Sequence, residues 1–170
     1  MAIDPADFLT PPKRRRMHVW FSDPALGVNV GVWDTTRMQE AFGPYPGDAF
    51  VIVLDGAFAM IDGAGRGAPV ETGRSVALRN GVPVSWMQAG YLRKVFLTLH
   101  DPHAPTPVIA SAEGGVVVLD PGAELTDADD ASLSDSGAEQ RDRVLFTNDA
   151  GAMVVSGSWL KFSNDVHRAW

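Results

Sequence analysis

One apolar stretch constrains the fold of this chain more than any other feature. Residues 48–56 read DAFVIVLDG, and a second apolar run, residues 57–61, follows directly. Val, Ile and Phe favour a buried, pleated surface, and an Asp-Gly pair supplies the positive φ angles of a tight turn. We therefore predict a β-hairpin whose turn is Asp55-Gly56, followed by a Gly-rich turn at residues 62–65.

Short β-like runs of the same kind recur through the first 120 residues. Gly, Pro and Asn turns separate them, and no helical periodicity is sustained, since only residues 35–42 fit a helical turn. Many short strands at regular spacing are typical of an all-β barrel or sandwich. The further strands are expected at residues 18–21, 27–33, 75–78, 82–87, 91–100, 108–110 and 116–119.

The first 122 residues divide into an arm and a barrel. Residues 1–16 contain Pro11-Pro12, which disfavours helix and strand alike, and they are expected to form a flexible arm. The only basic run, residues 13–16, is either a contact for an anionic partner or a solvated tail. Residues 17–122 hold the apolar strands and are assigned to the barrel.

The last third of the chain has a different composition. Residues 123–143 are acidic and contain few large apolar side chains, which predicts an exposed linker. Residues 146–159 resemble residues 21–33, since both run from Phe through a polar turn to an apolar strand that ends in Gly-x-Trp. We therefore expect residues 144–170 to be a partial second repeat of the barrel.

Composition argues against several classes of function. The net charge is −7 and the isoelectric point is about 4.9, whereas a generic nucleic-acid binder has a basic surface. No apolar run approaches the ~20 residues that span a bilayer, and the N-terminus does not resemble a secretory signal. The lack of cysteine excludes disulfides, thiolate metal sites and a cysteine nucleophile. We expect a cytoplasmic protein that binds neither nucleic acid nor membranes.

Six features together resemble the cupin superfamily. They are Gly31-x-Trp33, residues 48–56, Gly73, Arg79-x-Gly81, Trp86 and Arg93-Lys94. The resemblance is to the small-cupin branch that includes ethanolamine-utilisation-type and ureidoglycine-aminohydrolase-type proteins, with DUF861-like sequences. It implies an antiparallel double-sheet β-barrel of the jelly-roll kind, and a two-cupin chain whose second half is truncated.

The resemblance also implies where a metal site would lie. Cupins hold one divalent ion with three His and one Glu, but here the Glu position is Ala49 and the third His position is Val84. The His-x-His positions fall on Gly43 and Tyr45, or on Phe42 and Pro44, and the Asn position of the second motif is Gln88. A divalent metal needs three or four N or O donors, so we predict no metal and no other cofactor.

Asp48 is one residue from the missing Glu. On a strand, one step along the chain turns a side chain to the opposite face. A register slip or a bulge would therefore be needed to bring Asp48 into the site, and the His ligands would still be missing.

Four residues form the candidate ligand site. They are Tyr45, Trp86, Gln88 and Lys94, and the expected ligand is a small organic acid or amide. Lys94 shares a strand face with Leu92 and Phe96. If that face points into the barrel, the buried amine is functional, because burying a charge is costly; if it points outward, Lys94 is an ordinary surface residue.

Three functions remain open. The leading hypothesis is a metal-free, degenerate cupin that acts as a small-molecule-binding or structural module. The alternative is a metal-independent enzyme, as in epimerase-type cupins, in which Tyr45 and either Lys94 or His100 act as acid and base. A third possibility is an interaction role, in which a homodimer forms through sheet edges and the C-terminal segment.

Overall fold

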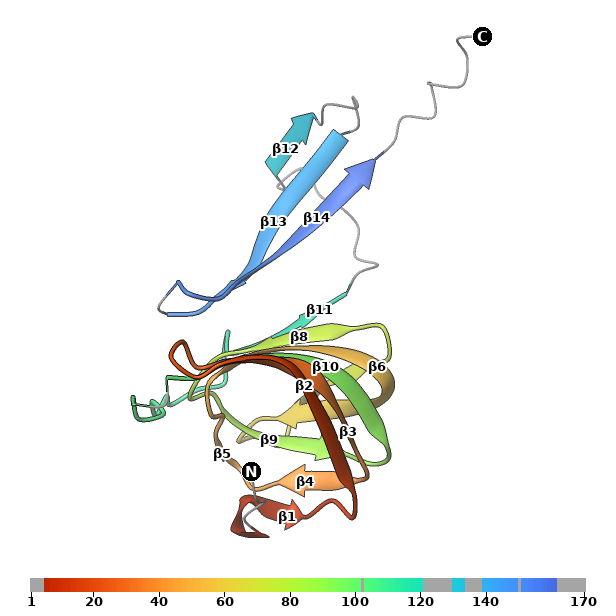
Figure 1. Cartoon of the computed structure of the whole chain (residues 1–170), viewed down its shortest axis with the longest axis vertical. Helices are drawn as coiled ribbons and strands as arrows, with labels where there is room; N and C mark the ends of the chain where they lie inside the picture. Colours follow the sequence, from red (N-terminus) through yellow and green to blue (C-terminus); the bar gives the residue numbers. More distant parts are fainter. Residues whose placement is uncertain (1–4, 102, 121–129, 134–138, 150, 162–170) are drawn as a thin grey trace. The chain divides into compact units, whose positions relative to one another are not determined.

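A computed structural model describes residues 5–101, 103–120, 130–133, 139–149 and 151–161 (Figure 1). These residues fall into two compact units, Met1–Pro121 and Gly122–Trp170. Strands dominate both units. Unit 1 contains the short 3₁₀ helix η1 (Pro5–Asp7) and strands β1 (Phe8–Thr10), β2 (Arg15–Asp23), β3 (Val28–Thr35), β4 (Met38–Glu40), β5 (Gly43–Pro44), β6 (Asp48–Ile61), β7 (Gly67–Glu71), β8 (Ser75–Leu78), β9 (Pro83–Gln88), β10 (Leu92–Leu99) and β11 (Val116–Leu119).

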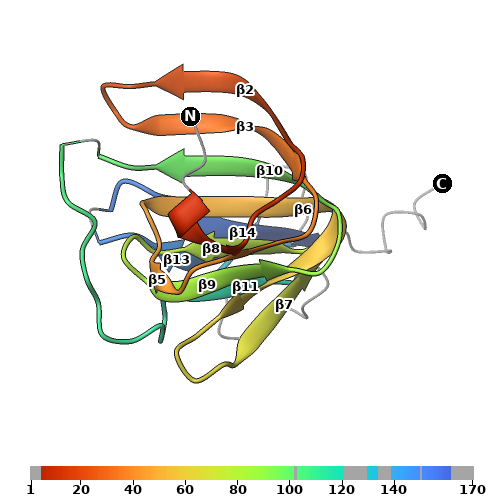
Figure 2. The ribbon, with the colours of Figure 1, turned by 90° about the horizontal axis from the view of Figure 1, so that it is seen from below.

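Unit 1 is built from two antiparallel layers that share β6. One layer runs β2-β3-β10-β6-β8-β11, and the other contains β1, β4, β9, β6 and β7. The first half of β6 pairs with β10 and β8, whereas residues 57–61 pair with β7 and residues 59–61 with β9. The sheet curls as β6 passes from one layer to the other (Figure 2). The predicted all-β, double-sheet barrel class is confirmed.

Gly56 is the corner at which β6 changes layers. Its φ angle is +86°, and a Cβ atom placed there would collide with the backbone carbonyl of Tyr91. The pairing of β6 with β10 also shifts register beside this corner, between Arg93 and Lys94. Strands that turn a barrel corner do so through bends and bulges of this kind.

The predicted hairpin turn at Asp55-Gly56 is wrong, since β6 continues through it as one strand. A two-residue type I′ turn needs positive φ at both central residues, and no non-glycine residue among those described has positive φ. The hairpin instead turns between β6 and β7, at the Gly-rich turn predicted at residues 62–65. There the Asp62 side chain accepts hydrogen bonds from the backbone N–H groups of Ala64 and Arg66.

A single apolar core fills the space between the layers of unit 1. Its centre is formed by Val51 and Val53 of β6, Val76 and Leu78 of β8, and Leu92 of β10, all essentially inaccessible to solvent. These residues follow the two-residue period of strands, because alternate side chains point to opposite faces of a sheet.

The N-terminal region and two predicted elements differ from expectation. The stretch 1–16, assigned to an arm, contains η1 and β1; β1 pairs with β4, and Phe8 packs against the core. The helical turn predicted at 35–42 is wrong, because β4 pairs there with β9. The strand expected at residues 108–110 is absent from the described structure, and that segment is a loop.

Unit 2 is a three-stranded antiparallel sheet. Its strands are β12 (Asp130–Leu133), β13 (Glu139–Thr147) and β14 (Val154–Lys161), in that order. β12 pairs with the start of β13, so there are strands within residues 123–143, which were predicted to be a linker. The stretch lacks large apolar side chains, but backbone pairing does not require them. Among the described residues of the chain, no helix has the length and apolar character needed to cross a membrane.

Candidate barrel site

Lys94 points into the barrel and is only 3% exposed. It lies on β10 between Trp33 of β3 and Val53 of β6. The inward orientation, which the sequence left open, is therefore the one observed. Lys94 forms no ion pair with a carboxylate of the described residues. A buried ammonium without such a partner is costly, so its surroundings decide how it is held.

Aromatic rings replace a carboxylate partner around Lys94. Its Nζ atom lies 3.6 Å from the centroid of Trp86 and 4.1 Å from that of Trp33. Phe58 stacks on Trp86 with centroids 3.7 Å apart and an interplanar angle of 5°. Phe58 therefore covers one face of Trp86 and the ammonium the other. Cation–π contacts are worth about 2 kcal/mol each when desolvated, which offsets part of the burial cost.

The charge of Lys94 is coupled to that of Glu40 on β4. Burial lowers the pKa of Lys94 to about 7, and the negative charge of Glu40 opposes this shift. Burial raises the pKa of Glu40, while the positive charge of Lys94 lowers it. Burial, and then the charge of Glu40, raises the pKa of Tyr45 well above its ordinary value. Glu40 thus links Lys94 electrostatically to Tyr45.

Gln88 holds Trp86 in place. The indole Nε1 of Trp86 donates a hydrogen bond to Gln88 Oε1 at 3.0 Å. The Gln88 amide then donates to the carbonyl oxygens of Thr36 at 2.9 Å and Gly90 at 3.2 Å. Because these bonds occupy both ends of the amide, Gln88 orients the ring that contacts Lys94.

A hollow of about 520 Å³ opens beside Glu40 and Tyr45. Ser85 Oγ donates to the backbone carbonyl of Glu40 at 2.6 Å, and Tyr45 exchanges backbone hydrogen bonds with Gly81 and Val82 at 2.8 Å. The volume lies within the range of small-molecule sites. Its lining also includes Asp7, Phe8, Phe42, Gly43, Pro44, Pro46 and Val84.

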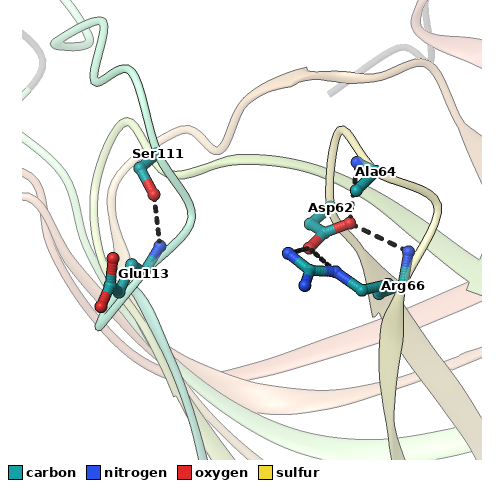
Figure 3. Close-up of polar contacts among 5 residues, drawn as sticks. All are labelled: Asp62, Ala64, Arg66, Ser111 and Glu113. Atoms are coloured by element: carbon teal, nitrogen blue, oxygen red, sulfur yellow. Dashed lines mark hydrogen bonds and ion pairs between the residues drawn. The ribbon is translucent and has the colours of Figure 1, made fainter.

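A larger hollow, of about 1010 Å³, lies between the β6–β7 turn and the segment before β11. Asp62 is already engaged there by the Arg66 guanidinium at 3.0 Å, and Ser111 accepts from the backbone N–H of Glu113 at 3.1 Å (Figure 3). Arg66 is largely exposed to solvent. The polar groups here are thus paired locally or lie in water, so the smaller hollow, which is lined by Glu40 and Tyr45, is the better candidate.

The residues at the expected metal positions do not fit a metal. Gly43 lies opposite Val84 on paired strands, and both line the smaller hollow with Tyr45. Ala49 is fully buried and is absent from the lining of that hollow. Glycine, valine and alanine side chains offer no donor atoms. Within the described residues, no group of three or more His, Asp or Glu side chains is arranged to hold a metal ion.

Asp48 and His100, the other two candidate residues, lie outside the smaller hollow. Asp48 accepts a hydrogen bond from the backbone N–H of Asn80 at 2.9 Å, which ties β6 to the turn before β9. His100 lies at the end of β10 against the backbone of Gly27 and Gly47, and its Nδ1 is buried without a hydrogen-bond partner. Neither residue lines the smaller hollow.

The structure thus brings the predicted residues together in part. Trp86 contacts Lys94 and is held in position by its hydrogen bond to Gln88. Tyr45 lines the hollow, and the charge of Glu40 raises the pKa of both Tyr45 and Lys94. Sequence reasoning missed Glu40, which lies in the stretch expected to be a helical turn. A strand assignment at residues 38–40 would have been needed to place Glu40 beside β9.

Solved structures that are similar to this chain include the following three. A protein of unknown function that belongs to the DUF861 family, from Pseudomonas syringae pv. tomato, matches with a TM-score of 0.52 and 27% identity over 56% of this chain and 40% of that one. The Clostridium difficile EutQ protein matches with a TM-score of 0.44 and 16% identity over 60% of this chain and 82% of that one. A cupin 2 conserved barrel domain protein from Leptotrichia buccalis matches with a TM-score of 0.43 and 18% identity over 51% of this chain and 41% of that one.

No family model and no curated protein matches the sequence. The chain spans 40% of the length of the Pseudomonas protein. The two-layer barrel, with β6 shared between the layers, agrees with the fold that the sequence resemblance implied. Unit 1 of this chain therefore has a barrel fold similar to that of the DUF861-family protein.

Proposed function

We propose that this chain is a metal-free, cytoplasmic cupin that binds a small organic acid inside its barrel, with Lys94 as the anion-binding group. One observation carries the proposal: the ammonium of Lys94 is buried between Trp33 and Trp86 and forms no ion pair with the described residues. Buried charges are rare unless a partner or a function compensates them.

A buried donor of the barrel interior lacks a hydrogen-bond acceptor at this point. The indole Nε1 of Trp33 is buried and has no hydrogen-bond partner, and Lys94 carries three N–H donors. Buried polar groups without partners are exceptional in folded proteins. A carboxylate supplies acceptor oxygens for both donors and a charge opposite to that of Lys94; an amide carbonyl supplies only the acceptor.

The hollow beside Glu40 supplies space for the rest of the ligand. Phe8, Phe42 and Tyr45 line it, so an apolar chain or ring can pack there. Burial raises the pKa of Glu40, and the positive charge of Lys94 opposes this rise. This arrangement favours a short acid with a small apolar body.

Calorimetric titration with a panel of short mono- and dicarboxylates and their amides tests this proposal. We expect carboxylates to bind more tightly than the matched amides, and to bind more tightly below pH 7 than above it, because Lys94 loses its charge as the pH rises through its pKa of about 7. Lys94→Met should abolish the preference, and Lys13→Met, at an exposed position, should leave it unchanged. Equal binding of acids and amides at both pH values would contradict the proposal.

A metal-independent acid–base enzyme is the second candidate. It is favoured by the coupling of Glu40 to both Lys94 and Tyr45, since proton transfer needs two groups of adjustable charge close to one site. Incubating the same acids with the protein in D₂O and following the C–H bond next to the carboxylate by NMR tests it. Deuterium incorporation that is lost in Glu40→Gln would support the enzyme; its absence with every acid that binds would leave the binding module.

A further inference from the structure

Phe42 lies between the two hollows of unit 1. It is the one residue that lines both the smaller hollow, of about 520 Å³, and the larger one, of about 1010 Å³. Phe42 stands in the segment between β4 and β5, and its side chain is 52% exposed and lies outside the apolar core. The fold therefore does not need this ring for its core, and the position of the ring points to a role in the hollows.

The ring of Phe42 reaches across to the turn between β6 and β7. A Cβ atom added at Gly63 of that turn would lie 3.4 and 3.9 Å from two ring carbons of Phe42, with no other neighbour within 4 Å. The edge of the ring therefore approaches the backbone of the turn, and it occupies the space between the turn and the segment before β5.

The rest of the wall between the hollows is thin. Pro44 of β5 and Pro83 of β9 are directly opposite each other in the paired strands, and Pro44 lines the smaller hollow whereas Pro83 lines the larger. The strand β5 has only two residues. The two hollows are thus adjacent, and one short strand pair and the ring of Phe42 lie between them.

The larger hollow suits an apolar group better than a charged one. Met60, Ile109 and Val116 line it, and all three belong to the apolar core or pack against it. The carboxylate of Asp62 is already paired with the guanidinium of Arg66 at the side of this hollow (Figure 3). A ligand in the smaller hollow would therefore gain apolar contacts, and no new ion pair with Asp62, by extending into the larger one.

We propose that Phe42 sets the upper limit on the length of the apolar body of the ligand, because its ring separates the smaller hollow from the larger. This inference rests on the proposed function, and it narrows the ligand class to short-chain aliphatic acids. A smaller side chain at position 42 joins the two hollows, and a larger one extends the wall. Since each buried methylene strengthens binding by about fourfold, chain length reports how far the ligand can extend.

Calorimetric titration with straight-chain monocarboxylates, from butanoate to decanoate, tests the role of Phe42. For the natural chain we expect affinity to rise by up to about fourfold per methylene and then to stop rising at a limiting length. Phe42→Ala should move this limit to longer acids, and Phe42→Trp should move it to shorter ones. Phe21→Ala is the matched control and should leave the limit unchanged, because Phe21 is 55% exposed and lines neither hollow.

The same titrations with 1-alkanols separate this inference from the proposed function. The alkanols have the same chains without the acid. Acids that bind no more tightly than alkanols would contradict the proposed function, whereas a limit that moves with residue 42 in either series would support the role of Phe42. Phe42→Trp opens no cavity, so it gives a second reading if Phe42→Ala loses its fold. An identical limit in the natural chain and Phe42→Trp, an equal change in Phe21→Ala, or a failure of both series to bind would overturn the role of Phe42.

Discussion

At the scale of single residues, the proposed ligand site depends on Lys94. The alternation on β10 predicted which residues share its face, but not which way the face points, because Leu92 and Phe96 are apolar and Lys94 is charged. The three-dimensional position of Trp33 and Trp86 settles the question, since their rings lie over the ammonium. Their approach depends on strands far apart in the sequence, so local patterning could not predict it.

The pH dependence of stability should reveal the buried amine. Lys94 has a pKa of about 7 in the folded chain and the ordinary value of 10.5 when unfolded. Between these values the unfolded chain binds more protons, so stability rises with pH by at most about 1.4 kcal/mol per pH unit. Below pH 7 this increment is absent.

Urea unfolding of the natural chain and of Lys94→Met measures this effect. The variant should lose the rise between pH 7 and 10.5, and below pH 7 it should be as stable as the natural chain or more so, because methionine removes the cost of a buried charge. Parallel stability curves for the two proteins across this range would contradict the buried, depressed amine.

Gln88 gives a second prediction at this scale. Sequence reasoning placed it in the ligand site, whereas its hydrogen bonds show it orienting Trp86. In Gln88→Glu, a carboxylate replaces the amide that donates to Thr36 and Gly90, so we expect a loss of roughly 1–3 kcal/mol in the free energy of unfolding. Gln39→Glu, on the less buried β4, is the matched control and should change stability much less.

At the scale of elements, β6 organises the barrel because it belongs to both layers. Its apolar residues could be predicted to form strands, since Val, Ile and Phe dominate them. The Asp-Gly pair was misleading, because a glycine with positive φ suits a barrel corner as well as a hairpin, and only the pairing partners distinguish the two. Here those partners are β10 before the corner and β7 and β9 after it.

Substitution of the corner glycine tests this role of β6. Gly56→Ala should destabilise the chain by roughly 2–4 kcal/mol, because alanine is strained at positive φ and its Cβ would also meet the Tyr91 carbonyl. Gly73→Ala is the matched control: it has the same φ of +86°, but nothing lies within 4 Å of the added Cβ. It should cost only about 1–2 kcal/mol. Equal losses in thermal unfolding would contradict the close approach at the corner.

At the scale of the whole molecule, the barrel class followed from many short strands between turns, and the resemblance to cupins suggested where to look for a site. The limit near residue 122 was visible as a change to acidic composition, and unit 1 ends at Pro121. The strands of unit 2 were less predictable, because residues 123–143 lack the apolar alternation that indicates strands.

Metal independence is a prediction for the whole protein. The positions at which cupins place metal ligands are occupied by Gly43, Tyr45, Ala49 and Val84, which do not form a ligand set. Elemental analysis of the purified chain should therefore find no stoichiometric transition metal, and added Mn²⁺, Ni²⁺ or Zn²⁺ should not raise its thermal midpoint. A stoichiometric metal would contradict the proposed function.

The most direct test of the central claim is the titration of Lys94 itself, followed by NMR of its side-chain carbon and nitrogen with Lys94→Met used for assignment. We predict a midpoint near pH 7, and an upward shift of that midpoint when a bound carboxylate stabilises the ammonium. A midpoint at the ordinary lysine value of 10.5, unchanged by any acid, would show that Lys94 is neither buried in the barrel nor part of a binding site.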